Sequence, residues 1–185
     1  MARTGHVKKM ARGGEAERAG HVHHGAMRSQ YLDGVSIRPL RNGDTETVAA
    51  VFARLGHDSR RQRFGGPKPG LSEPELAALA RVDGEHHVLV AYVDGDRRPA
   101  GLARLVRQGR AAEVAFEVAD EHQGRKIGSA LMRVLAADAR AAGIVEHHAT
   151  VTGNNRRAIS LLSRSARRLR GTWLGGQCEL VAALD

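Results

Sequence analysis

The chain has 185 residues, of which 42% are apolar but only 3% aromatic, and its formal net charge at pH 7 is +9. No apolar run reaches the roughly 18 residues that would suggest a membrane-spanning helix, and the single cysteine, Cys178, excludes an internal disulfide. The N-terminus lacks the apolar core of a signal peptide, so we expect a cytoplasmic protein with one aliphatic core.

The first 34 residues differ in composition from the rest of the chain. Residues 1–30 are rich in glycine, alanine, arginine and histidine and hold almost no large apolar side chain, so they cannot bury a core. The histidines of this segment have no cluster of cysteines or acids at metal-ligand spacing, and we predict no metal site. We therefore expect a basic, flexible tail over residues 1–34 and one folded domain over residues 35–185.

From residue 35 the hydrophobic pattern predicts a regular succession of elements. Ser72 begins one helix, with a proline and two acids in its first turn, and Asn154 or Asn155 caps another. In chain order the predicted elements are strand 35–40, helix 44–55, helix 73–82, strands 87–93, 100–107 and 112–118, helix 127–142, strand 145–151, helix 155–168 and strand 177–184.

This order begins with antiparallel strands that meander and continues with a strand–helix–strand crossover. The fold class that it predicts is α+β, with a mixed, mostly antiparallel sheet and helices on both faces.

The segment from residue 118 to residue 130 joins an apolar strand to an amphipathic helix and carries the strongest functional signal. Gly124 and Gly128 let main-chain N–H groups turn outward at the start of the helix, where those groups and the helix dipole favour an anion. Arg125 and Lys126 add two positive charges. The spacing matches neither a P-loop nor a dinucleotide fingerprint. We expect a bound phosphate or pyrophosphate; the alternative is an ordinary turn with basic surface residues.

This segment resembles the acyl-CoA loop of the GNAT superfamily of N-acetyltransferases, V-x-x-x-x-[QR]-x-x-G-x-[GA]. The matching residues are Val118, Gln123 and Gly128. Lys126 stands where that family usually has a glycine. Residues 155–161 resemble the family's N-x-x-A-[IV]-x-L helix, whose asparagine approaches the CoA arm. Leu162 follows, where many members carry a tyrosine that protonates the leaving thiolate.

The resemblance implies the GNAT fold over roughly residues 35–184, with the crossover at the acyl-CoA loop, and acetyl-CoA as the acyl donor. The residues that it implies in acetyl-CoA binding are Phe116, Glu117, Val118, Gln123, Gly124, Arg125, Lys126, Ile127, Gly128, Ser129 and Asn155.

Four segments are similar to bacterial protein lysine acetyltransferases of the Pat type: residues 52–55, 59–64, 67–76 and 112–120. Such proteins often attach this domain to a regulatory or acyl-CoA-synthetase-like domain. The resemblance implies a protein lysine as the acceptor amine. It also implies that Glu113 is the catalytic glutamate.

Amine chemistry gives an independent reason to look for a carboxylate here. An amine with a pKa of about 10.4 is almost entirely protonated at neutral pH, and only its neutral form attacks a thioester. Glu113 and Glu117 lie four residues apart on one predicted strand, so they share a face. Glu113 is the predicted general base, with Glu117 as the alternative. His147 and His148 lie on the next strand, where a packed or surface role is favoured over contact with an acceptor.

Three other readings stay open at this stage. The acceptor could be a small amine, or the domain could sense acyl-CoA without turnover. The third reading is a nucleic-acid binder, which a dense set of arginines over residues 156–170 suggests. Against it, the chain lacks the aromatic residues of a stacking platform. A solvated helix face is the simpler explanation for that run.

Overall fold

The computed structural model describes residues 29–32, 34–152 and 155–184. Within them lie β1 (Gln30–Leu32), β2 (Val35–Pro39), α1 (Thr45–Ala53), α2 (His57–Phe64), α3 (Glu73–Leu79), β3 (His86–Val93), β4 (Pro99–Gln108), β5 (Ala111–Val118), the short 3-10 helix η1 (Asp120–His122), α4 (Ile127–Ala141), β6 (Glu146–Thr152), α5 (Arg156–Ser165), β7 (Arg168–Leu174) and β8 (Gln177–Ala183).

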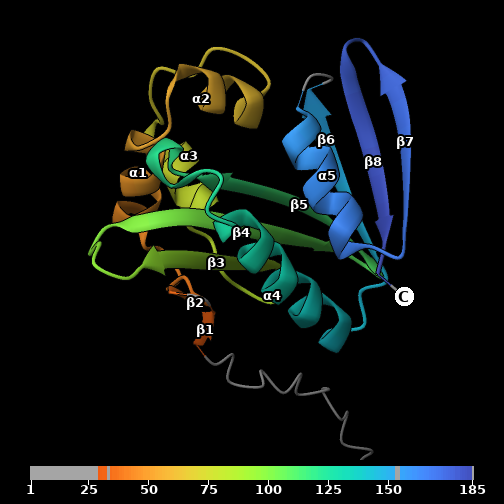
Figure 1. The fold of residues 1–185 in the computed structure, drawn as a ribbon, viewed down its shortest axis with the longest axis horizontal. Helices are drawn as coiled ribbons and strands as arrows, with labels where there is room; N and C mark the ends of the chain where they lie inside the picture. Colours follow the sequence, from red (N-terminus) through yellow and green to blue (C-terminus); the bar gives the residue numbers. More distant parts are fainter. Residues whose placement is uncertain (1–28, 33, 153–154, 185) are drawn as a thin grey trace, which may run out of the picture.

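The described strands form one sheet in the order β1-β2-β3-β4-β5-β6-β8-β7. Neighbouring strands are antiparallel except for β5 and β6, which run parallel because α4 connects them as a crossover (Figure 1). The predicted α+β class, with a mixed sheet and a crossover after residue 118, is therefore confirmed. No described helix is long and apolar enough to cross a membrane.

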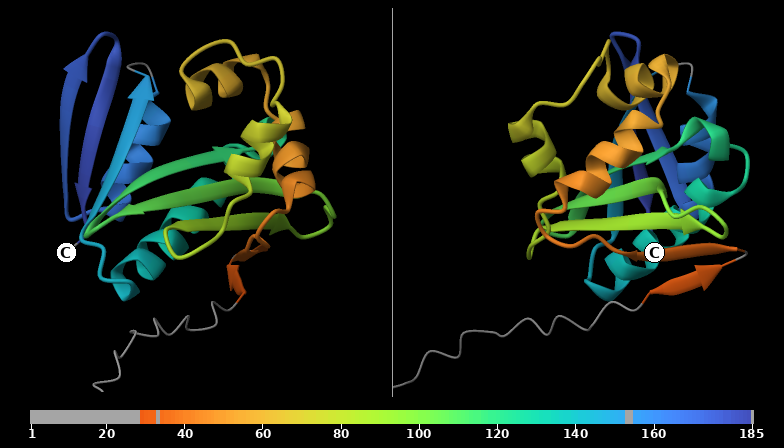
Figure 2. Two further views of the ribbon diagram at one scale, coloured as in Figure 1. Left: turned by 180° about the vertical axis from the view of Figure 1, so that it is seen from behind. Right: turned by 90° about the vertical axis from the view of Figure 1, so that its left-hand side faces the viewer.

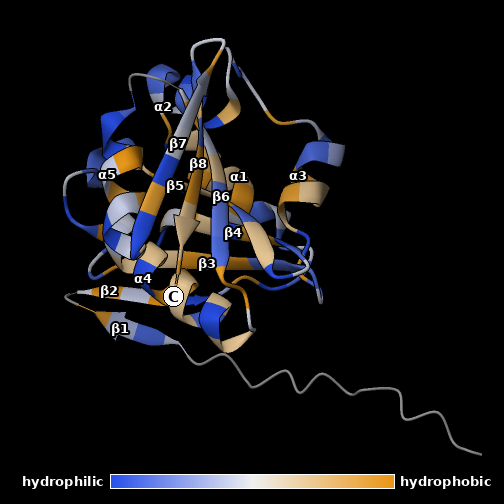
Figure 3. Ribbon diagram, turned by 90° about the vertical axis from the view of Figure 1, so that its right-hand side faces the viewer, coloured by the Kyte–Doolittle hydropathy of each residue, from blue (hydrophilic) through white to orange (hydrophobic). Residues whose placement is uncertain are grey.

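Helices cover both faces of the sheet (Figure 2). Alternate residues of each strand face opposite layers. On one face, Val88 and Val90 of β3 pack in a cluster with Val48 and Val51 of α1. On the other, Leu89 belongs to the larger core cluster that α4 and α5 cover. Figure 3 shows apolar residues along the central strands and a mixture of apolar and polar residues on the helices that cover them.

Strands β5 and β6 pair over only part of their length. Within the described residues the ladder joins Ala111–Glu113 to Glu146–His148 and ends there. Beyond this point the two strands diverge (Figure 1). The second half of β5 keeps β4 as its partner on one edge and has no strand partner on the other. Its free edge can therefore pair with an extended ligand.

Besides the short 3-10 helix η1, the structure adds three elements that the sequence pattern did not predict. Helix α2 buries none of its residues, so it has no apolar stripe to reveal it. Strand β7 lies at the sheet edge with almost every residue exposed, and the predicted helix 155–168 ends instead at Ser165. Strand β1 falls within the stretch expected to be a tail, while residues 1–28 lie outside the described residues.

Candidate active site

The start of α4, where the sequence predicts an anion site, has main-chain N–H groups that turn outward as expected. Gly124 has φ +78° and Lys126 has φ +63°, so the chain turns through two left-handed residues just before the helix begins at Ile127. In the described structure no side chain caps this end, whereas Asp44 caps α1 and Asn155 caps α5. The first main-chain N–H groups of α4 are therefore available to an anion.

The left-handed backbone at Lys126 explains why the acyl-CoA loop pattern that this segment resembles usually has a glycine at this position. In this conformation a residue with a Cβ atom is destabilised by roughly 1–2 kcal/mol, whereas glycine is not. The lysine adds a charge beside the open N–H groups at the cost of local strain.

Replacing Lys126 by glycine should therefore raise the free energy of unfolding by up to about 1 kcal/mol, after the greater freedom of glycine in the unfolded chain is subtracted. Urea unfolding measures this change. Lys126→Ala is the matched control, because it removes the charge but keeps the Cβ atom. Equal stability of the two variants would contradict strain at this residue.

Gly128 lets the first turn of α4 approach its neighbours closely. A Cβ atom at this position would lie 3.0 Å from Leu161 Cδ1 and 3.7 Å from Val118 Cγ2. This glycine therefore sits where α4, α5 and the end of β5 meet. The neighbouring Ile127 is buried in the core, so only its main chain can serve a ligand.

The remaining predicted acetyl-CoA residues gather around this junction. Phe116, Glu117 and Val118 form the end of β5, and Ser129 continues the first turn of α4. The Oδ1 atom of Asn155 accepts a hydrogen bond from the Ala158 N–H at 3.0 Å. Its carboxamide NH₂ group is left for another acceptor.

Gln123 fastens the loop to the rest of the molecule. Its Nε2 atom donates to Val118 O at 3.3 Å and to Ser59 Oγ at 3.0 Å, and its Oε1 atom accepts from Arg157 at 3.0 Å. The side chain thus joins the end of β5, α2 and the start of α5. Its part in acetyl-CoA binding would be to hold the loop in place.

A second set of contacts, centred on Arg54 at the end of α1, holds the loop before α4 in place. We call this set of contacts the brace. Arg54 donates from Nη2 to Asp96 at 2.6 Å, from Nε to Glu121 at 2.6 Å and from Nη1 to Pro99 O at 2.8 Å. Its side chain is only 8% exposed. The Nη2 atom also lies 2.9 Å from His122 Nε2. Asp96, Glu121 and His122 could in principle hold a metal ion, but the guanidinium already supplies the positive charge among them.

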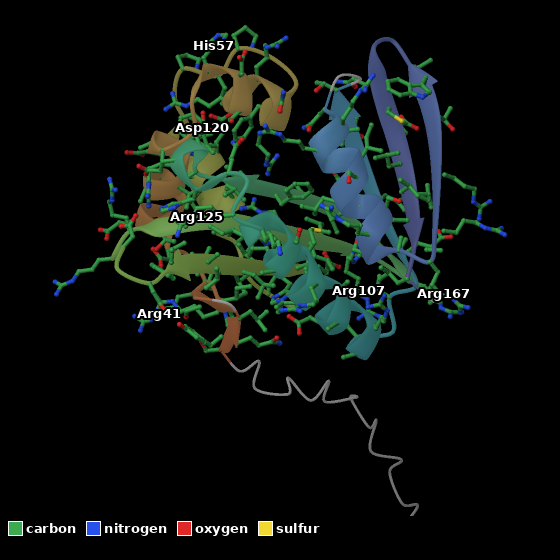
Figure 4. The ribbon with its side chains drawn as sticks, viewed as in Figure 1. Arg41, His57, Arg107, Asp120, Arg125 and Arg167 are labelled. Atoms are coloured by element: carbon green, nitrogen blue, oxygen red, sulfur yellow. The ribbon has the colours of Figure 1, made fainter. Side chains whose placement is uncertain are left out.

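Asp120 and Arg125 complete this brace. The Asp120 carboxylate accepts a hydrogen bond from Ser59 Oγ at 2.6 Å, and a side chain at Gly56 would collide with that carboxylate. Arg125 donates to His122 Nδ1 at 2.9 Å. Figure 4 shows Asp120 and Arg125 on the loop below α2. The sequence singled out the segments that hold Arg54 and Ser59 but gave these residues no role.

The two glutamates of β5 share a face but have different surroundings. Glu117 is 9% exposed, and its Oε2 atom accepts a hydrogen bond from Arg63 Nε at 2.6 Å. Glu113 is exposed and makes no hydrogen bond or salt bridge with the described residues. It is also the last residue of β5 that pairs with β6. Glu117 is thus engaged in an ion pair, while Glu113 has a free carboxylate where the strands part.

Arg104 lies on the same face, opposite Ala115 of β5. It is buried and donates a hydrogen bond to Leu79 O at the end of α3. Burial lowers the pKa of its guanidinium to about 10, which still leaves it charged at neutral pH. Arg104 and Arg63 therefore add positive charge around Glu117.

The two histidines of β6 point to opposite faces. His148 is half-exposed and is the ladder partner of Glu113. His147 is fully buried, and neither ring nitrogen has a hydrogen-bond partner among the described residues. Burial, with smaller effects from Arg140 and His148, lowers the pKa of His147 to about 4. His147 is therefore a neutral packing residue, and only His148 lies on the face of Glu113.

The low pKa of His147 predicts a loss of stability in mild acid. The unfolded chain binds a proton at His147 below about pH 6.5, whereas the folded chain binds one only near pH 4, so stability falls as the pH drops between these values. The loss should reach about 3 kcal/mol and then level off. Urea unfolding at pH 7, 5.5 and 4.5 measures it. His147→Leu should flatten this dependence, and an unchanged dependence would show that other groups cause it.

A sheet that splays beside an open helix N-terminus, with a free carboxylate at the point of divergence, is the arrangement that an acyl-CoA-dependent N-acyltransferase requires. Comparison with known proteins agrees. The model of the acetyltransferase (GNAT) family matches residues 54–166. The chain belongs to this family, whose members take the acetyl group from acetyl-CoA. It is therefore an acyltransferase with acetyl-CoA as its donor.

Individual relatives refine the comparison. The chain is 31% identical over 132 residues to acetyltransferase Pat of Mycolicibacterium smegmatis, a match that spans 69% of this chain but 39% of that protein. The crystal structure of the GNAT domain of S. lividans PAT superposes with a TM-score of 0.73 at 28% identity, over 81% of this chain and 90% of that one.

A more distant structure shares the fold. Spermidine N-acetyltransferase from Vibrio cholerae, in complex with CoA and spermine, has a TM-score of 0.61 at 17% identity, over 83% of this chain and 97% of that one. The chain thus corresponds to about two-fifths of the curated Pat protein and to nearly the whole of the solved PAT domain.

Proposed function

We propose that this domain transfers the acetyl group of acetyl-CoA to a lysine side chain of a protein, with Glu113 as the general base. The observation that carries the mechanism is the free carboxylate of Glu113 at the point where β5 and β6 separate. The similarity to the Pat domains supports a protein lysine as the acceptor.

In this proposal the donor lies between the two strands. The N–H groups at the start of α4 bind the pyrophosphate, and Arg125 and Lys126 add charge. The pantetheine arm pairs with the free edge of β5 at Phe116 to Val118. Asn155 offers its carboxamide NH₂ to the arm from the start of α5. This arrangement places the thioester near the beginning of the divergence, within reach of Glu113.

The reaction then needs one proton transfer before the bond changes. Glu113 takes a proton from the ammonium group, directly or through a water molecule, and the neutral amine attacks the thioester carbon. The C–N bond forms, the nitrogen gives up its second proton to water, the C–S bond breaks, and CoA leaves as its thiolate. Leu162, in the position where many family members have a tyrosine, is fully buried and cannot donate a proton. We therefore assign protonation of the thiolate to water.

The donor site is tested by calorimetry with acetyl-CoA. Gly128→Val should weaken binding roughly tenfold, because the added methyl groups crowd Leu161 and Val118 at the start of α4. Gly84→Val is a matched control, since a Cβ atom at that position meets nothing within 4 Å. An unchanged affinity in Gly128→Val, or no binding to the unaltered protein at millimolar ligand, would contradict this placement.

The acceptor is tested by mass spectrometry. Lysate proteins are incubated with isotope-labelled acetyl-CoA and either the unaltered protein or Glu113→Gln, with spermidine as a competing small amine. Labelled lysines that depend on Glu113 support the proposal. Label found only on spermidine would identify a small-amine acetyltransferase instead.

A further inference from the structure

We propose that the first half of β7 is a docking surface for acidic residues that flank the acceptor lysine. This inference rests on the proposed function, because it assumes that the acceptor is part of a polypeptide. The surface consists of Arg167, just before β7, and of Arg168 and Arg170 within it. These three residues, which we call the arginine surface, line an open hollow of about 380 Å³ together with Ala183 of β8.

Sheet register places this arginine surface on the same face as the proposed base. Glu113 of β5 is the ladder partner of His148, His148 of Val181, and Val181 of Arg170. Ladder partners in neighbouring strands share a face, so the side chains of Glu113 and Arg170 project from the same side of the sheet. Arg168 lies two residues from Arg170 and shares that side.

The same register gives the distance between base and arginine. Adjacent strands are about 4.8 Å apart, so three steps separate the Cα atoms of Glu113 and Arg170 by about 14 Å. An extended peptide advances about 3.3 Å per residue, so a chain that crosses the strands covers this span in about four residues. If the acceptor lysine of a peptide lies beside Glu113, a residue about four positions away in that peptide thus reaches the arginines.

The charge of the surface selects acidic partners. Arg167, Arg168 and Arg170 are exposed and form no salt bridge with the described residues, and Asp185 lies outside them. The nearest acids on this face are Glu146 and Glu179. Glu146 lies 3.4 Å from His148, and neither acid is paired with an arginine. Figure 3 shows two hydrophilic bands with one apolar band between them at the start of β7, on the sheet edge. The excess of positive charge favours an acidic segment.

The experiment measures kcat and KM for peptides that each contain one lysine. One series carries glutamate four residues before or after the lysine, and its control series carries glutamine at the same positions. The unaltered protein should favour the glutamate peptides on one side by about five- to twentyfold in kcat/KM, through KM and not kcat. The preference should shrink as salt is raised.

Charge reversal supplies the matched variants. The double variant R168E/R170E should lose the preference for glutamate and favour peptides with arginine at the same positions. Arg41→Glu is the control, because Arg41 is exposed and lies on the far side of the molecule from Arg167 (Figure 4). It should keep the preference. Equal kcat/KM for glutamate and glutamine peptides would overturn the docking surface and leave the lysine acceptor standing.

A binding measurement separates failure of this inference from failure of the proposed function. If no peptide is acetylated although acetyl-CoA binds, the proposed acceptor is wrong. Fluorescence anisotropy with a lysine-free acidic peptide then decides: binding that R168E/R170E abolishes supports the surface, and no binding overturns it. Tighter binding of a single-stranded RNA of equal charge, lost in the same variant, would assign the arginines to nucleic acid and also overturn the inference.

Discussion

Replacing Glu113 by glutamine should lower kcat at neutral pH by about 10²–10⁴-fold, the usual contribution of a general base. Glutamine keeps the shape of the side chain but cannot accept the proton of the ammonium group. Acetyl-CoA affinity should change little, because in the proposed site this side chain faces the amine and not the pyrophosphate. The rate of the unaltered protein should rise with pH as acceptor amines lose protons, and the variant should recover part of its deficit at high pH.

The control for this experiment is Glu117→Gln. Glu117 is paired with Arg63, so its replacement should disturb the contact between α2 and β5 more than proton transfer. Steady-state kinetics and urea unfolding on both variants distinguish the two effects. If Glu117→Gln abolishes turnover while Glu113→Gln is as fast as the unaltered protein, Glu117 is the base. If neither slows the reaction, the amine loses its proton to water.

Replacing Arg54 by methionine should destabilise the protein by about 2–4 kcal/mol. The substitution leaves Asp96 and Glu121 without their buried partner and Pro99 O without its donor. Because these groups hold the loop before α4, acetyl-CoA affinity should also fall. Urea unfolding measures the first effect, and calorimetry below the unfolding temperature of the variant measures the second.

Arg98→Met serves as the matched control. Arg98 contacts the same two acids, at 3.3 Å from Asp96 and 3.7 Å from Glu121, but its side chain is 65% exposed. Exposed pairs of this kind are worth only about 0.2–1 kcal/mol. A similar loss of stability in both variants would show that burial of Arg54 is not what matters. A large loss in Arg54→Met without weaker acetyl-CoA binding would separate the brace from the donor site.

The sequence by itself determined the strand, turn and helix start on which the donor site is proposed. A strand, a glycine-containing turn and the start of an amphipathic helix follow one another within residues 114–130, so hydrophobic periodicity and glycine positions reveal them locally. The two-residue period likewise put Glu113 and Glu117 on one face. The cap at Asn155 was also visible, since capping depends on neighbouring residues.

Only the tertiary structure decided which glutamate is free and what holds the loop. Arg63 lies 54 residues before Glu117, and Arg54 lies 67 residues before Glu121. Such pairs join polar side chains across distant segments and leave no periodic signal in the sequence. The same is true of the row from Glu113 to Arg170, because it depends on the register of three strand pairs. Register is set by how whole strands bury their apolar faces and not by any one residue.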